Sequence, residues 1–138
     1  MTFTVLAGQG LDVAKLGEHR DELRARLGAY ESFQRTPDAP VTDHFDHLDL
    51  MLTYDDTGRL ELIEVASPAD VVFSSVPLLG RSCPDVVEEL AEQGIVGVEH
   101  DSLVEFREQG FCLFSEDLHD EDVELDGVGV FAPGYYDR

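Results

Sequence analysis

The chain has 138 residues, of which 43% are hydrophobic and 28% are charged, a composition typical of a single globular domain. Its 30 acidic and nine basic residues give a net charge of −21, and a surface this negative repels nucleic acid and anionic membrane. No apolar run approaches the roughly 20 residues of a membrane helix, and the N-terminus lacks a basic leader. We therefore expect a cytoplasmic protein that binds neither nucleic acid nor membrane.

Charge is distributed unevenly along the chain. Residues 1–35 contain five acidic and five basic residues, so the remainder of the chain carries the whole net charge of −21. Such a segment attracts a cationic partner or a metal ion. The alternative interpretation is that the acidic residues serve solubility alone.

A first helix is predicted at residues 18–27, where Leu16, Leu23 and Leu27 share one face. Acidic residues come early in this segment and arginines late, as the helix dipole favours, and Gly28 is suited to the C-cap. The residues before this helix are interpreted as a short extended lead-in.

A β-hairpin is predicted next, with strands at about 44–54 and 60–66. Apolar and polar residues alternate from Leu48 to Tyr54, which is typical of a strand with one buried face. Gly58 can take the positive φ that the short polar connection requires.

The second half of the chain begins with another predicted helix, at residues 84–93. Ser82 and Asp85 resemble a capping box, Pro84 suits the first turn, and Gly94 ends the pattern. Further short strands are predicted at 71–73, 96–98, 103–106, 111–115 and 128–132.

An internal repeat connects the two halves, because Leu16-Gly17 maps onto Leu79-Gly80 with a constant offset of 63 positions. Pseudo-repeats are predicted at about 14–76 and 77–137. We therefore predict an α+β fold with a single domain, in which two tandem helix-plus-antiparallel-strand units form one sheet with both helices on one face. Chance similarity between two such units is the alternative. The predicted core consists of Leu23, Leu27, Leu50, Leu52, Ile63, Val86, Leu90, Leu113 and Val130.

The segment from Leu16 to Gly28 has the pattern Leu-Gly-x-x-Arg-x-x-Leu-x-x-x-Leu-Gly and precedes a hairpin. It resembles the SmpA/OmlA type of small lipoprotein domain, and its doubled form resembles the β-lactamase inhibitor protein family, whose fold is a tandem of such units. The whole chain resembles small uncharacterised cytoplasmic proteins of high-GC actinobacteria, which share the motifs at 54–59, 78–80 and 134–137. The resemblance implies a binding scaffold rather than a catalyst. It does not imply lipid attachment, because there is no lipobox cysteine, or β-lactamase binding, which needs a secreted protein.

Two histidines and two aspartates, His44, Asp46, His47 and Asp49, lie within six residues and are possible ligands of a divalent metal. If this segment is a strand, His44 and Asp46 point to one side and the other two to the opposite side, so a single site uses only half of them. A solvated strand start is the alternative interpretation. No nucleophile elbow, phosphate loop or zinc-protease motif occurs, so we predict no catalytic residue and no cofactor.

The segment 116–126 is an acidic run with seven carboxylates, and it lacks the ligand spacing of an EF-hand. It is interpreted as a long loop between two strands, suited to contact with a basic protein partner. The carboxylates predicted to make this contact are Asp117, Asp120, Glu121, Asp122 and Glu124.

The two cysteines are far apart in the chain and are expected to be reduced thiols. Cys112 lies in an apolar run and is predicted to be a core residue. Cys83 lies at a predicted helix start, where a thiolate is favoured, but no histidine is near it in sequence, and we interpret it as a residue of the capping region.

Two classes of function stay open. The first is a non-catalytic interaction protein, such as an inhibitor, an immunity-type protein or an adaptor, whose acidic sheet face or 116–126 loop binds a basic partner. The second is a small enzyme or a divalent-metal-dependent ligand binder that uses His44, Asp46 and Asp49. A deep pocket with a carboxylate of strongly raised pKa favours the second class, and a flat acidic sheet face favours the first.

Overall fold

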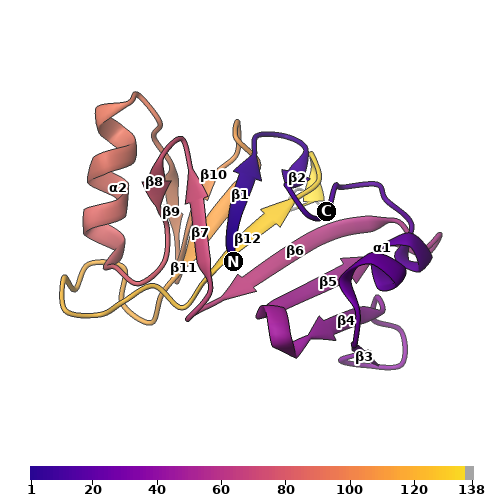
Figure 1. The fold of residues 1–138 in the computed structure, drawn as a ribbon. Helices are drawn as coiled ribbons and strands as arrows, with labels where there is room; N and C mark the ends of the chain where they lie inside the picture. Colours follow the sequence, from indigo (N-terminus) through magenta and orange to yellow (C-terminus); the bar gives the residue numbers. More distant parts are fainter. Residues whose placement is uncertain (136–138) are drawn as a thin grey trace.

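Most of the regular structure is β-strand, arranged in two sheets with two short helices (Figure 1). The computed structural model describes residues 1–135. Of these residues, 39% are in strands or β-bridges and 16% are helical, 3-10 turns included.

The larger sheet has eight strands in the order β3-β4-β5-β6-β12-β11-β10-β9. All neighbours in it are antiparallel, so β3 to β6 form one meander and β9 to β12 form another. The two meanders join where β6 pairs with β12, with Val65 opposite Val128. The strands are β3 (Glu31–Phe33), β4 (Thr42–Phe45), β5 (Leu50–Tyr54), β6 (Leu60–Ala66), β9 (Val98–His100), β10 (Leu103–Phe106), β11 (Phe111–Phe114) and β12 (Gly127–Phe131).

The smaller sheet has four strands in the order β2-β1-β7-β8. Its central pair is parallel, with Phe3 opposite Val71, although β1 and β7 are far apart in the chain. In Figure 1 these two strands lie in front of the strands of the second meander. The strands are β1 (Thr2–Leu6), β2 (Gly10–Leu11), β7 (Asp70–Phe73) and β8 (Val76–Pro77).

The two helices begin at side-chain caps. Helix α1 (Arg20–Leu27) begins after His19, whose Nδ1 accepts a hydrogen bond from the backbone N–H of Asp21 at 3.2 Å. Helix α2 (Cys83–Glu92) begins after Ser82, whose Oγ accepts one from Asp85 at 3.3 Å. In Figure 1, α2 lies beside β8, and α1 lies at the opposite end of the large sheet.

The two faces of the large sheet have different surroundings. Its inner face carries residues such as Leu52, Ile63 and Val130, which belong to one hydrophobic core together with buried residues of both helices and of the small sheet. Phe73 of β7 contacts Phe111 of β11 there, with ring centroids 5.0 Å apart. Alternate residues of each strand lie on the outer face, which neither the helices nor the small sheet cover.

The predicted α+β fold class is wrong, since the fold is mostly β with two sheets. The lead-in at the N-terminus forms β1 and β2, and β1 pairs with β7, which pairs with β8, to build a second sheet over the inner face. The small sheet therefore covers part of the inner face of the large sheet, which the prediction expected helices alone to cover. Two tandem helix-plus-strand units are not present, because the strands within residues 1–135 form two sheets, of four and eight strands, with only two short helices.

The predicted core residues are buried with one exception, Leu27, which is half-buried at the end of α1. The predicted strand at 44–54 is also divided. Strand β4 ends at Phe45, and a 3-10 turn, η1 (Asp46–Leu48), follows it. Strand β5 begins after Asp49, which has a left-handed backbone with φ of 56°.

Replacing Leu90 by Ala should lower the free energy of unfolding by roughly 2–5 kcal/mol, because Leu90 is fully buried between α2 and the sheets. The matched variant Leu27→Ala should lower the free energy of unfolding by less, since the Leu27 side chain is only half-buried. Urea denaturation measures both. A loss below about 1 kcal/mol for Leu90→Ala would contradict the assigned core face.

Candidate functional site

A buried carboxylate lies between α1 and the large sheet. Asp43 on the inner face of β4 is 0% exposed. The guanidinium of Arg24 donates two hydrogen bonds to it, from Nε to Oδ2 at 2.7 Å and from Nη2 to Oδ1 at 2.9 Å. Tyr54 donates its hydroxyl to Oδ2 at 2.7 Å, and Ser32 donates to Oδ1. This set of bonds attaches α1 to the first meander.

The contacts of Asp43 determine its ionisation. Burial raises the pKa of the Asp43 carboxyl, but the hydrogen bonds from Arg24, Ser32 and Tyr54 outweigh burial and hold the pKa below its ordinary value. Burial and the bond to Asp43 raise the pKa of the Tyr54 phenol above its usual range. Asp43 is therefore a paired anion whose role is structural. The sequence interpretation missed this network because it began the strand at about residue 44 and gave residue 43 no inward-facing position.

The predicted metal ligands lie on a strand end and the turn that follows it. His47 has its Nε2 3.0 Å from the carbonyl oxygen of Leu27, at the end of α1. Nε2 of His44 lies 3.9 Å from the carboxylate of Asp46, while Asp49 caps the turn. Within residues 1–135, no three His, Cys, Asp or Glu side chains form a group that could hold a metal.

The acidic loop 116–126 lies between β11 and β12 and is anchored by two leucines. Leu118 is 6% exposed and Leu125 is 1% exposed. The backbone N–H of Leu125 donates to the carbonyl of Arg81 at 2.8 Å, which attaches the loop to the start of α2. All five predicted partner-binding carboxylates are exposed, namely those of Asp117, Asp120, Glu121, Asp122 and Glu124.

Two of these carboxylates also shape the loop. Asp117 accepts a hydrogen bond from the backbone N–H of His119 at 3.0 Å, and Asp120 accepts one from Asp122 at 2.8 Å. The ring of His119 then contacts Glu99 of β9, with Nε2 and Oε1 2.9 Å apart. The loop therefore lies against the last strand of the large sheet.

The outer face of the large sheet presents a continuous cross-strand row. In this row, one residue of each strand lies opposite one residue of the next strand, so all the side chains of the row share the outer face. The row consists of His44, Met51, Glu64, Gly129, Cys112, Glu105 and Val98.

A small apolar cluster lies beside this row. Leu62, Cys112 and Phe131 are its buried members, and Phe114 and Tyr135 pack on them while staying partly exposed. An aromatic and aliphatic centre therefore occupies the middle of the outer face.

Glu64 lies in a hollow of about 200 Å³ where the two meanders join, together with Met51, Phe114 and Gly127. Burial raises the pKa of the Glu64 carboxyl, and the charge of Arg35, whose Nη2 is 3.9 Å from Oε1, partly offsets that effect. A carboxylate of raised pKa is therefore present, in a hollow smaller than the roughly 300 Å³ typical of small-molecule sites.

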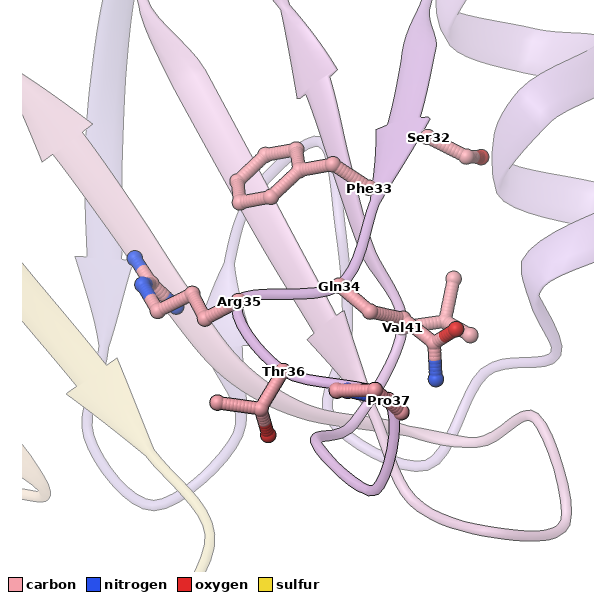
Figure 2. A pocket seen from close by; sticks show the side chains of 7 residues that line it. All are labelled: Ser32, Phe33, Gln34, Arg35, Thr36, Pro37 and Val41. Carbon is pink, nitrogen blue, oxygen red and sulfur yellow. The ribbon is translucent and has the colours of Figure 1, made fainter.

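A second hollow, of about 530 Å³, lies at the end of β3 (Figure 2). Figure 2 shows Phe33 and Arg35 on one side of the chain, while Ser32 points to the other side, toward α1. The Arg35 guanidinium lies 5.6 Å from the centroid of the Phe33 ring. This arrangement places a cation over the exposed ring at this edge of the sheet.

Both cysteines are buried thiols. Cys83 is the first residue of α2, and burial, together with the negative charge of Glu99, raises the pKa of its thiol to about 11. The thiolate is therefore disfavoured, and Cys83 acts as a packing residue.

Comparisons with protein-family models, with curated proteins and with solved structures found no match for this chain. The resemblance inferred from the sequence therefore stays a prediction. Among the described residues, 1–135, no helix has both the length and the apolar character needed to cross a membrane.

Replacing Asp43 by Asn should lower the free energy of unfolding at neutral pH by about 3 kcal/mol, because it leaves Arg24 without its counter-ion at a largely buried position. The control Asp46→Asn should change little, since that carboxylate is 97% exposed. Chemical denaturation measures both variants.

The difference between the wild type and Asp43→Asn should depend on pH. Asp43 has a lowered pKa in the folded protein, so its contribution is full above the unfolded pKa of about 3.9 and is lost as the pH falls through the folded value. A difference that stayed constant down to about pH 2 would show that the ion pair does not account for the effect.

Proposed function

We propose that this protein is a non-catalytic interaction protein, of the inhibitor, immunity or adaptor kind, that binds a basic protein partner. The observation that carries the proposal is the outer face of the eight-stranded sheet, which the helices and the small sheet leave uncovered. Phe114 and Tyr135 are partly exposed at its centre, and Glu64 lies beside them. An apolar centre surrounded by polar residues is typical of protein interfaces.

The charge of the chain supports a basic partner. Residues beyond position 35 carry the whole net charge of −21, and the acidic loop 116–126 lies at the edge of the large sheet. A negative surface accelerates encounters with a positive one through long-range attraction. The burial of Leu118 and Leu125 anchors this loop, and a loop that is anchored before a partner arrives lowers the entropy cost of binding.

The alternative of a small enzyme or metal-dependent ligand binder has less support from the geometry. His47 is bonded to the end of α1, and the raised pKa belongs to Glu64, on another strand and in a small hollow. The four residues from His44 to Asp49 do not form a shared site in this arrangement.

Replacing Asp120, Glu121 and Asp122 by Ser should slow association with the partner several-fold at low salt, because long-range attraction weakens. Added salt should slow the wild type as well, since charges are screened over roughly 8 Å at physiological ionic strength. The partner is captured from cells that express the protein, identified by mass spectrometry and purified, and association is then measured by stopped flow.

The matched control replaces three exposed acids around the first meander, Glu22, Asp38 and Asp56, by Ser. This control removes the same number of negative charges as the loop variant. If the position of the charges in the loop matters, the control should slow association less than the loop variant does. All three proteins should have similar unfolding free energies, because the substituted residues are exposed. If neither salt nor the loop substitutions alter the rate, the acidic surface only solvates the protein and the proposal fails.

A further inference from the structure

The last strand of the large sheet, β9, has an unpaired edge. It pairs with β10 on one side, and within residues 1–135 no strand pairs with its other side. Val98 in this strand is 60% exposed and Val96 just before it is 74% exposed, while all three residues of β9 are exposed. Exposed backbone donors and acceptors beside exposed valines are the features by which a sheet edge accepts another strand.

A groove of about 550 Å³ lies over β9 and β10 on the outer face, next to this edge. Val96, Val98 and His100 form one wall, and Glu105 and Arg107 of the neighbouring chain segment lie beside them. The Glu105 carboxylate is contacted by Nε2 of His100 at 3.3 Å and by Nε of Arg107 at 3.2 Å. His100, Glu105 and Arg107 therefore contact one another, while Val96 and Val98 expose apolar side chains beside the strand backbone.

Negative charge surrounds the same edge. Glu99 and Asp101 are exposed on β9 and the turn after it, and the contact between His119 and Glu99 brings the acidic loop 116–126 alongside. This charge opposes a second copy of a chain that itself carries −21. It favours an occupant that is extended, positively charged and in part apolar.

The other edge of the large sheet, at β3, has a positive charge of its own beside its exposed apolar side chain. Phe33 of β3 is 37% exposed, and the guanidinium of Arg35 already lies over its ring (Figure 2). The chain's own Arg35 covers the apolar ring there, whereas at the β9 edge Arg107 contacts Glu105, and Val96 and Val98 stay exposed.

We propose that β9 accepts an extended basic segment of the partner as an added strand of the large sheet. Alternate apolar side chains of this segment bury Val96 and Val98, and its intervening Lys or Arg side chains face Glu99, Asp101 and the 116–126 loop. The inference rests on the proposed function for the positive charge of the partner, and it adds the surface and the mode of binding.

The test uses the full chain and three synthetic peptides, followed by amide NMR titration and hydrogen exchange. The first peptide is acetyl-Lys-Val-Lys-Val-Lys-Val-amide. The second has the same side chains but carries N-methyl groups on alternate backbone amides, which prevents strand pairing. In the third, Glu replaces Lys.

The first peptide should shift the amide signals of residues 96–101 and slow hydrogen exchange in β9, because its backbone completes the edge. The N-methylated and the Glu peptides should bind far more weakly. Replacing Val96 and Val98 by Ser should weaken binding of the first peptide about tenfold, which corresponds to roughly 1.4 kcal/mol. The control Phe33→Ser at the other edge should have no effect on it. Both variants should stay folded, since the substituted side chains are exposed.

Several outcomes would overturn strand addition at β9. These are equal binding of the N-methylated peptide, no binding of the first peptide, or shifts confined to the loop 116–126 or the centre of the outer face. Shifts confined to the loop or the outer face would overturn strand addition but not the proposed function. The salt dependence of association with the partner tests that function independently. Protection of β9 that grows with concentration of the protein alone would assign the edge to a second copy instead.

Discussion

The pairing of β6 with β12 is the contact on which the rest of the structure depends. It joins two meanders that are each formed from neighbouring strands, and it makes one eight-stranded sheet with a shared inner face. Both helices and the small sheet bury their apolar residues against that face. Because the helices and the small sheet cover only the inner side, the same pairing also creates the outer face, where the candidate binding surface lies.

The inner face tolerates the buried charge of Asp43 because that charge is fully paired. Asp43 lies among apolar neighbours, yet each of its oxygens accepts hydrogen bonds from Arg24, Ser32 or Tyr54. A pair of this kind adds little net stability compared with apolar packing, but it requires a single position of α1 on the sheet. The outer face holds its carboxylates differently, since Glu105 contacts His100 and Arg107, and Glu64 lies in a hollow near Arg35.

Local patterns predicted part of this structure. Alternation from Leu48 to Tyr54 and the polar connection at Gly58 specify a hairpin whatever surrounds it, and capping at Ser82 specifies the start of α2. The parallel pairing of β1 with β7 could not be predicted, because these short strands are stabilised by contacts far apart in the chain. The exposed acids of the 116–126 loop were predictable from their run of charges. The unpaired edge of β9 depends on the order of strands, which no local pattern contains.

In the acidic loop, the two anchoring leucines, Leu118 and Leu125, are constrained by folding, whereas the exposed residues between them are not. The leucines are held by the core, while the residues between them contact it little. Substitutions at these intervening positions can accumulate with little effect on folding, so a lineage can change the charge and shape of this surface without first acquiring stabilising mutations elsewhere. The loop is thus a place where new surface chemistry can arise on an unchanged framework.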